Sequence, residues 1–478
     1  EGADKYVDEL VVWRELAYSF CRFGPDPDTL AAIPDWARTT LERHESDPRT
    51  VYDWETLARG RTGDPLWDTA QHSLLRHGEL HNNVRMTWGK ALVGWSRDAQ
   101  QALDRLIDLN HRYALDGRDP ASYGGLLWAL GQFDRPFRPE QPVLGSVRGR
   151  GTAEHARRLD VAAWAEWLGG PSVGPSVRVA VVGAGVAGAA CARTLVDHGI
   201  DVQLFEASDR VGGRLGSVAL DGVRVDAGAQ HLTVRNAMLE RWMAAWVERG
   251  VAALWAGPFG TVEDGAFEQA DLSPRFVGVP RMAGLVAHLC RDVPLRLGTP
   301  VTELVREGAW RVGDASFDWL VLALPPGHGL VAGRAPEAAI QPVTVAVLHL
   351  PHATAWSFAE ARLPEGPVER VVRDASRPGR PAGERWMVAS RPGFQGDPDS
   401  LVRAARNVFD LPEPLTVEVT TWDVGTAEVQ SDALFQMDDD NVLLCGSCVY
   451  PGRVENALLS GVAAAGRLLG ELAARASG

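Results

Sequence analysis

One glycine-rich stretch, residues 177–206, constrains the fold of this chain more than any other part of it. Val177 to Val182 is a short β-branched run that ends in glycines, which predicts a buried parallel strand. Gly183, Gly185 and Gly188 follow with the G-x-G-x-x-G spacing of a dinucleotide-binding turn. In such a turn the first glycine permits the bend, the second lets a pyrophosphate approach the backbone, and the third lets the next helix pack on the strand.

The residues after this turn complete a strand–helix–strand unit. The run from Ala189 to His198 predicts a helix whose N-terminal N–H groups face the phosphates, and Gly199 ends it. Asp201 to Phe205 predicts the second strand, and Glu206 follows directly. An acid at this position suits an adenosine ribose 2′-hydroxyl and disfavours a 2′-phosphate. The stretch therefore predicts a Rossmann-like dinucleotide site.

Motifs beyond Glu206 favour FAD over NAD. Gly212-Gly213-Arg214 comes first, and Asp226-Ala-Gly-Ala-Gln-His231 follows it. The later motifs are Arg275-Phe-Val-Gly-Val-Pro-Arg-Met282, Asn441-Val-Leu-Leu-Cys-Gly446-Ser-Cys448 and Gly452-Arg-Val-Glu455-Asn456. Together these segments resemble the flavin amine oxidase superfamily, in particular its bacterial renalase-like branch, over about residues 177–475.

This resemblance implies a discontinuous FAD-binding domain with an inserted β-rich substrate lobe, roughly Met238–Arg281 and Ala346–Thr421. Val301 matches a family strand whose backbone meets the adenine. The implied cofactor-binding residues are Gly183, Gly185, Gly188, Glu206, Gly213, Arg214, Val301, Gly446, Arg453, Glu455 and Asn456. The candidate substrate-pocket residues are His231, Arg275, Phe276, Pro280 and Trp422.

The resemblance also implies a reaction, the transfer of hydride from an amine or a dihydropyridine ring to flavin N5, with the electrons passed on to oxygen. His231 is the candidate catalytic residue beside the flavin, and an ordinary polar loop residue is the alternative. The lysine that many amine oxidases place near N5 has no equivalent, because no lysine follows Lys90. We see no metal cluster in the sequence and predict flavin chemistry without a metal.

Residues 1–170 have a different pattern. Apolar residues recur at helical spacing, turn-rich breaks separate these runs, and no stretch with the period of a strand stands out. The predicted helices are Val7–Phe20, Pro34–His44, Pro65–Arg76, Val84–Trp95, Ala99–Tyr113 and residues 162–168. Residues 171–176, rich in proline, glycine and serine, predict a linker. This part of the chain is therefore predicted to be an all-α domain.

Short motifs in this half keep the order and spacing of another family. They include Arg14-Glu-Leu-Ala-Tyr-Ser-Phe-Cys21, Asp64-Pro-Leu-Trp67, Arg85-Met-Thr-Trp88-Gly-Lys90 and Leu115-Asp116-Gly-Arg-Asp-Pro120. They resemble the class II cyclobutane pyrimidine dimer photolyases, whose all-α domain holds FAD. The resemblance implies that Arg85 and Asp116 contact a second flavin and that Asn110 faces its N5. Trp67, Trp88 and Trp95 would form the tryptophan chain that passes electrons to the photoexcited flavin.

Simpler interpretations stand beside these. The three tryptophans could be ordinary core residues in a chain with 17 tryptophans. Arg148, Arg150, Arg157 and Arg158 could form a solvated basic face or contact DNA phosphates. Asn83 and Gly149-Arg150 depart from the photolyase pattern near the lesion pocket. Cys445-Gly-Ser-Cys448 has C-x-x-C spacing without a thioredoxin-like context, so we do not expect a redox disulfide.

Composition limits the remaining classes. The net charge of −14 does not favour nucleic acid by bulk electrostatics, and five cysteines show no disulfide framework. No apolar run reaches the ~18 residues of a transmembrane helix, so we expect no membrane partner and a cytoplasmic protein. The chain starts at Glu1, just before a predicted helix and without an initiator Met, which is the pattern of a truncated N-terminus.

The sequence thus predicts a multidomain protein in three parts. Residues 1–170 form a photolyase-type all-α domain, 171–176 a linker, and 177–478 an α/β Rossmann-like FAD-binding, renalase-like oxidoreductase domain. Three functions follow from this layout. The first is an FAD-dependent oxidoreductase acting on an amine or a reduced nicotinamide-like compound. The second is light-driven repair of pyrimidine-dimer DNA, with the oxidoreductase half keeping the flavin reduced. In the third, the helical half is a non-catalytic docking module.

Overall fold

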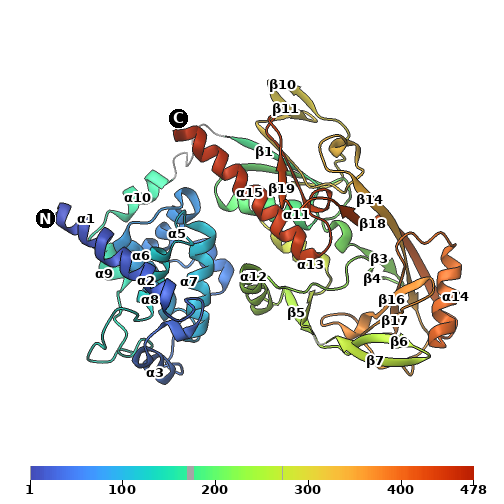
Figure 1. Ribbon diagram of the computed structural model, residues 1–478, viewed down its shortest axis with the longest axis horizontal. Helices are drawn as coiled ribbons and strands as arrows, with labels where there is room; N and C mark the ends of the chain where they lie inside the picture. The colour runs from blue at the N-terminus through green and yellow to red at the C-terminus, as the bar shows by residue number, and fades with distance from the viewer. Residues whose placement is uncertain (1, 169–176, 272, 478) are drawn as a thin grey trace. The chain divides into compact units, whose positions relative to one another are not determined.

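The computed structural model describes residues 2–168, 177–271 and 273–477 (Figure 1). The predicted linker at 171–176 lies outside the described residues. Two compact units can be distinguished by their internal contacts. The helical unit contains the described residues up to Leu168 together with Asp197–Gly199, and the sheet unit contains the rest of the described chain.

The helical unit has helices and one isolated bridge, Gln141 to Gly145, and no strand among residues 2–168. Aspartates start several of its helices: Asp64, Asp98 and Asp119 each accept a backbone N–H of the first turn with their side chains. The helices are α1 (Gly2–Val7), η1 (Asp8–Trp13), α2 (Arg14–Phe23), η2 (Leu30–Ala32), α3 (Asp35–Arg43), α4 (Trp54–Ala58), α5 (Pro65–His77), α6 (Asn82–Gly94), α7 (Ala99–Tyr113), α8 (Pro120–Ala129), α9 (Thr152–Ala156) and α10 (Val161–Leu168).

The sheet unit is built on a six-stranded sheet in the order β19-β20-β13-β1-β2-β9. Its strands are β1 (Arg178–Val182), β2 (Asp201–Phe205), β9 (Leu295–Arg296), β13 (Trp319–Leu322), β19 (Phe435–Met437) and β20 (Val442–Cys445). All neighbours are parallel except the edge pair β19–β20. Helix α11 (Val186–Asp197) connects β1 to β2, as the glycine-rich stretch predicts.

A second, seven-stranded sheet has the order β18-β14-β17-β16-β15-β6-β7 and corresponds to the predicted β-rich lobe. Its strands are β6 (Phe259–Glu263), β7 (Ala266–Asp271), β14 (Ala338–His349), β15 (Glu360–Arg362), β16 (Val368–Arg373), β17 (Arg385–Ser390) and β18 (Thr416–Val429). Helix α14 (Pro398–Phe409) packs on it through Leu401, Ala405 and Phe409. Apolar burial of this kind stabilises the lobe independently of the six-stranded sheet.

The other elements of the sheet unit lie between or after the strands of these two sheets along the chain. They are η3 (Gly213–Leu215), β3 (Ser217–Leu220), β4 (Val223–Asp226), α12 (Ala237–Glu248), β5 (Ala252–Trp255), β8 (Arg275–Gly278), α13 (Ala283–Leu289), β10 (Val305–Glu307), β11 (Ala309–Val312), β12 (Ala315–Phe317), η4 (Gly329–Val331), η5 (Asp374–Ser376), η6 (Gly446–Cys448) and α15 (Val454–Ser477). The pairs β3–β4 and β5–β8 and the group β10-β11-β12 are antiparallel.

Helix α15 is the one described helix that is long and apolar enough, by length and composition, to cross a membrane, over Val454–Arg475. Ala464, Ala465 and Leu468 are fully buried within the protein. A core helix passes the same test, so this is a weak indication of a membrane span.

Candidate flavin sites

The first glycine loop has the geometry that its spacing predicts. Gly183 has a φ of +102°, and a Cβ at that position would lie 2.6 Å from the Ala323 carbonyl oxygen. A Cβ on Gly188 would lie 1.9 Å from the Gly183 carbonyl oxygen, so only glycine lets α11 start this close to β1. A Cβ on Gly185 would meet nothing within 4 Å. The loop is therefore tight at its ends and open at Gly185.

The Gly212-Gly213-Arg214 segment lies against this loop. The Gly212 N–H donates to the Ala184 carbonyl at 2.9 Å, and a Cβ on Gly213 would lie 3.3 Å from the Gly185 Cα. Glycines on both sides thus leave backbone facing backbone. This is the arrangement that allows a diphosphate to approach main-chain N–H groups.

Glu206 directly follows β2, beside the same loop. Its Oε2 accepts the Ala184 N–H at 2.8 Å, and its Oε1 accepts the Ser208 N–H at 3.0 Å. The carboxylate is thus fixed in orientation by backbone groups of the first glycine loop and of its own turn. A fixed acceptor at this point can take a ribose hydroxyl, as the sequence predicts.

The environment of Arg214 indicates whether these residues can bind a diphosphate. Burial lowers the pKa of its guanidinium, and no described residue pairs with the charge. A partly buried cation without a counter-charge is unfavourable unless a missing anion completes it. The two facing glycine loops and the unpaired Arg214 therefore fit the diphosphate of FAD.

Val301 does not lie on a strand, contrary to the family resemblance. It follows Pro300 in a loop between β9 and β10. Two bonds to the β2 end hold this loop, since Gly298 N–H donates to Ser208 O at 2.8 Å and Thr299 N–H to Glu206 O at 2.9 Å. Val301 thus follows, two residues after Thr299, a loop segment that is hydrogen-bonded to the Glu206 turn.

The closing helix approaches the glycine turn closely. Gly446, at a φ of +81°, would place a Cβ 3.0 Å from the Ala187 Cβ, and Gly461 would place one 2.1 Å from the Ala187 carbonyl oxygen. Glu455 Oε1 accepts the backbone N–H groups of Arg235 and Asn236, each at 2.8 Å. This oxygen therefore holds the start of α15 to the chain before α12.

The neighbours of Glu455 have different environments. Asn456 Nδ2 donates to the Pro451 carbonyl at 2.9 Å, whereas Arg453 is exposed. Cys445 and Cys448, which precede this helix, are buried and free. Burial raises the pKa of Cys448 to about 12, so its thiol is protonated and unreactive at neutral pH.

His231 lies in a cluster of charged groups that the sequence does not reveal. Its Nδ1 is 3.3 Å from Oε2 of Glu360, which is 1% exposed, and Arg275 Nη1 lies 3.0 Å from the same oxygen. Burial acts to raise the pKa of Glu360, but contacts with His231, Arg370 and Arg275 outweigh it and lower the pKa to about 2. Burial lowers the pKa of His231. At neutral pH the cluster therefore holds an ionised Glu360 and a neutral imidazole.

Two other candidate pocket residues lie beside this cluster. Phe276 exchanges backbone hydrogen bonds of 2.9 Å with Leu232, the residue after His231. Trp422 of β18 donates its Nε1 to the Ala227 carbonyl at 2.8 Å and lies 3.0 Å from the Cβ position of Gly216. Residues from β8, β15 and β18 are thus brought to the Asp226–His231 segment. Pro280 lies elsewhere, in the wall of a separate hollow.

In the helical unit, four aromatic rings form a continuous array. Trp67 of α5 stacks on Trp88 of α6 with ring centres 6.1 Å apart and planes 8° apart. Trp67 also meets Trp95 edge-on at 5.5 Å, and Tyr52 meets Trp95 at 5.0 Å. Trp67 and Trp88 are each 1% exposed, whereas Trp95 and Tyr52 are half-buried. The array therefore runs from the interior of the unit toward its surface.

The Arg85, Asp116 and Asn110 set is also brought together. Arg85 pairs with Asp116 through two bonds, at 2.7 and 2.9 Å. Ser122, which no sequence motif marks, accepts from both Arg85 at 3.2 Å and Asn110 Nδ2 at 2.8 Å. Asn110 is fully buried, and its Oδ1 has no partner among the described residues. A buried acceptor without a hydrogen-bond donor lowers the stability of the fold. A bound ligand that donates a hydrogen bond to this oxygen would remove that penalty.

The described residues contain no group of three or more His, Cys, Asp or Glu side chains that could hold a metal ion.

Comparisons with known proteins find matches in both parts of the chain. The model of the NAD(P)-binding Rossmann-like domain matches residues 181–246. The deoxyribodipyrimidine photo-lyase of Oryza sativa subsp. japonica is 38% identical over 170 residues, which are 35% of this chain and 33% of that protein. The mitochondrial protoporphyrinogen oxidase of Nicotiana tabacum is 52% identical over 56 residues, 12% of this chain and 11% of the relative.

The putrescine oxidase of Kocuria rosea is 51% identical over 55 residues, 12% of each protein. The chain thus spans about a third of the length of the photo-lyases that it matches and a smaller share of the oxidases. The matched relatives are enzymes, and the matches support the predictions of a flavin-type oxidoreductase with FAD as its cofactor. The chain therefore joins a segment similar to the deoxyribodipyrimidine photo-lyases to a Rossmann-like segment similar to the flavin-type oxidoreductases.

Proposed function

We propose that the sheet unit is an FAD-dependent oxidoreductase that oxidises an amine or a reduced nicotinamide-like compound. The observation that carries this proposal is the unpaired, partly buried Arg214 beside two facing glycine loops. FAD, when bound, supplies an acceptor for hydride. The likeness to putrescine oxidase supports an amine as the first substrate class to test. A renalase-like specificity and a cytoplasmic location belong to the same proposal.

His231 has the setting of a proton acceptor for an ammonium substrate. Its Nδ1 faces the ionised Glu360 carboxylate at 3.3 Å, which favours the tautomer with the proton on Nδ1. The lone pair then lies on Nε2, and the lowered pKa keeps the ring neutral at pH 7. We assign His231 Nε2 as the atom that takes the proton from the substrate nitrogen before hydride leaves the adjacent carbon.

Anaerobic reduction of the holoenzyme tests this proposal. Putrescine, a primary monoamine and NADH are each mixed with the protein, and the flavin absorbance near 450 nm is followed. At least one of these three donors is expected to reduce the flavin and so to abolish its absorbance near 450 nm. His231→Gln is expected to slow bleaching at pH 7 by about 100-fold, within the usual range for a lost general base, while FAD content stays unchanged. Failure of all three donors would contradict the proposal.

We propose a second function for the helical unit, the light-driven repair of pyrimidine-dimer DNA. The aromatic array of Tyr52, Trp95, Trp67 and Trp88 supports it, since rings at these spacings can carry an electron from the half-buried end to the buried end. The buried Asn110 with its unpaired Oδ1 supports a ligand nearby. The likeness to deoxyribodipyrimidine photo-lyases supports pyrimidine-dimer DNA as the substrate class to test.

Repair of a thymine-dimer oligonucleotide under blue light tests this second proposal. The full chain is compared with Trp67→Phe, which keeps an aromatic ring in the core but removes the indole that contacts both Trp88 and Trp95. Photoreduction is expected to slow in Trp67→Phe, whereas Trp386→Phe, in the sheet unit, should leave it unchanged. If the full chain repairs nothing, the helical half would instead be the docking module of the third hypothesis.

A further inference from the structure

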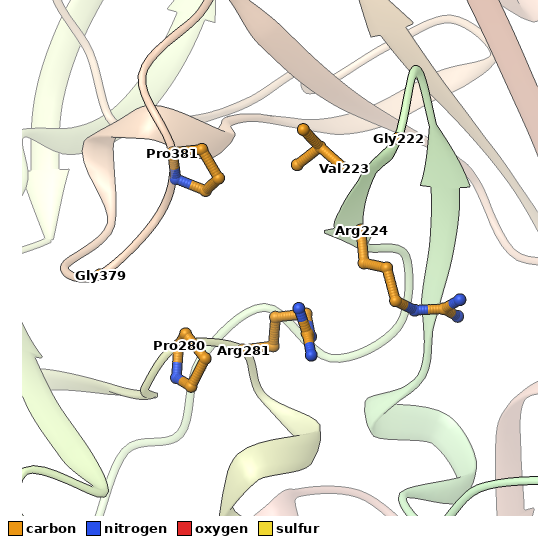
Figure 2. A pocket seen from close by; sticks show the side chains of 7 residues that line it. All are labelled: Gly222, Val223, Arg224, Pro280, Arg281, Gly379 and Pro381. Carbon is orange, nitrogen blue, oxygen red and sulfur yellow. The ribbon is translucent and has the colours of Figure 1, made fainter.

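A separate hollow of about 250 Å³ lies in the sheet unit, lined by residues from three segments (Figure 2). One is the tip of the β3–β4 hairpin, the second is the turn before α13, and the third is the loop after η5. The lining residues are Gly222, Val223, Arg224, Pro280, Arg281, Gly379 and Pro381. This volume lies just below the range of about 300–1,000 Å³ that is usual for small-molecule sites in proteins, so only a small ligand would fit.

The three walls are fixed to one another by a single buried arginine. Arg380, between Gly379 and Pro381, donates to Asp226 at 2.5 Å and to the Gly278 carbonyl at 2.9 Å. Asp226 lies on β4 two residues after Arg224, and Gly278 precedes the Pro280 turn. Because the Arg380 side chain is fully buried, these bonds are shielded from water. These bonds therefore fix the three walls of the hollow relative to one another.

Glycine at position 379 allows two of these walls to approach. Gly379 has a φ of +73°, and a Cβ there would lie 2.8 Å from a Val279 side-chain carbon. A side chain at 379 would thus push the third segment away from the Pro280 turn. The close approach supports a built hollow between the two loops.

The charge of the hollow is positive. Arg281 reaches the space between the Pro280 turn and the hairpin, and no described residue accepts a hydrogen bond from it (Figure 2). Arg224 donates its Nε to Ser217 Oγ at 3.0 Å, and no carboxylate among the described residues pairs with it. No acidic side chain is among the lining residues. Two arginines therefore face or flank the hollow without a balancing charge among the described residues.

The surroundings do not compensate this charge. Asp209, the acid whose charge acts on Arg224, is already paired with Arg210 at 2.7 Å. Burial and the charges of Arg210 and Arg281 lower the pKa of Arg224, which reports the same local excess of positive charge. Val223, Pro280 and Pro381 supply apolar surface next to it. The hollow thus combines cationic and apolar walls.

We propose that this hollow binds a small organic anion, with its phosphate or carboxylate group on Arg281 and its apolar body against Val223, Pro280 and Pro381. Arg224 contributes its charge and its aliphatic stem. Guanidinium groups match the planar, two-oxygen edge of both kinds of anion. The site is additional to the proposed redox function, and its occupancy does not depend on which donor reduces the flavin.

Calorimetric titration of the FAD-loaded full chain tests this site. Phenyl phosphate and benzoate are the two charged probes, and benzamide is the neutral probe of the same shape. At least one charged probe is expected to bind at least 10-fold more tightly than benzamide, and the stronger one identifies the anionic group. Equal binding of benzamide, or no binding of either anion, would overturn the proposal.

Variants separate a built site from general attraction to positive charge. Arg281→Gln should weaken binding at least 10-fold, and Arg281→Lys should restore part of it. Val223→Trp keeps both arginines but fills the hollow, and it should abolish binding. Arg311→Gln, a change to an exposed side chain of β11, is the matched control and should bind like the unchanged chain. If Arg281→Gln or Val223→Trp binds as well as the control, the site does not exist.

The same variants distinguish this proposal from the redox one. Flavin content and anaerobic bleaching are measured in each of them alongside the titration. A variant that loses anion binding but keeps normal flavin bleaching supports a separate anion site. If the protein binds the anion normally but no donor reduces its flavin, the anion site is supported and the redox proposal is contradicted. Arg281→Lys, which keeps the charge, shows whether the fold tolerates a change at this position.

Discussion

Arg214 is the single residue on which the cofactor assignment rests most directly. Its guanidinium is partly buried and unpaired among the described residues, so a diphosphate would provide its counter-charge. We predict that Arg214→Gln weakens FAD binding by about 10- to 100-fold, the effect of losing a charge-assisted hydrogen bond of about 1.5–3 kcal/mol. Equilibrium titration of the apoprotein with FAD measures this change. Arg210→Gln, an exposed residue paired with Asp209, is the control and should bind FAD normally.

Lys90 gives a prediction about pH in the helical unit. It is 6% exposed, and burial lowers its pKa from 10.5 to about 8, although its Nζ donates to the Trp128 and Ala129 carbonyls. The unfolded chain holds this proton up to about pH 10.5, whereas the folded chain loses it near pH 8. Because the unfolded state binds more protons between these values, the free energy of unfolding rises with pH across that window.

Across this window Lys90 raises the free energy of unfolding by about 3 kcal/mol, because each pH unit between its folded and unfolded pKa values corresponds to about 1.36 kcal/mol. Lys90→Met removes this contribution. The free energy of unfolding of the variant should therefore change less between pH 8 and pH 10 than that of the unchanged chain. Urea unfolding at several pH values measures the difference. Parallel pH profiles for the two proteins would contradict the assignment of a depressed pKa to this lysine.

At the level of elements, the contact between β1 and α11 depends on a missing side chain. A Cβ on Gly188 would lie 1.9 Å from the Gly183 carbonyl oxygen, a backbone atom that cannot move without displacing the turn. We predict that Gly188→Ala destabilises the sheet unit by roughly 2 kcal/mol or more, within the range for backbone strain, and lowers its FAD content. Gly466→Ala, in α15 with open space around the Cβ position, should instead stabilise by about 0.5–1 kcal/mol. Thermal unfolding followed by circular dichroism compares the two.

The same elements show what could be predicted from the sequence. The glycine spacing predicted the β1–α11–β2 unit because each glycine is required by a local contact, and helical periodicity predicted most helices of the helical unit. The photolyase resemblance named Trp67, Trp88 and Trp95 together. It could not place Trp67 in contact with the other two, because that contact depends on how α5 packs on α6.

Long-range partners were the features that the sequence could not provide. Glu360 meets His231 from a strand of the other sheet, and Ser122 joins Arg85 to Asn110, with no local pattern that marks either residue. The strand predicted around Val301 was wrong for a local reason. Pro300 has no N–H for a sheet ladder, and it restricts the residue before it, so regular pairing starts only at Val305.

At the scale of the whole molecule, the two candidate sites use different residues and should lose their ligands separately. Gly185→Val fills the open space between the glycine loops, and no described atom lies within 4 Å of the new Cβ, so the fold should persist. We predict that this variant loses one equivalent of FAD per chain because the diphosphate can no longer approach. Arg85→Gln should leave that equivalent in place, since its pairs lie with Asp116 and Ser122 in the helical unit.

The flavin released on denaturation, divided by the protein concentration, measures this stoichiometry. A second equivalent that is lost in Arg85→Gln and kept in Gly185→Val is the result that light-driven repair requires, because the aromatic array would otherwise have no acceptor at its buried end. One equivalent, lost only in Gly185→Val, would leave the oxidoreductase as the redox centre of the chain. Full retention of FAD in Gly185→Val would contradict the cofactor site itself, whichever function the helical unit has.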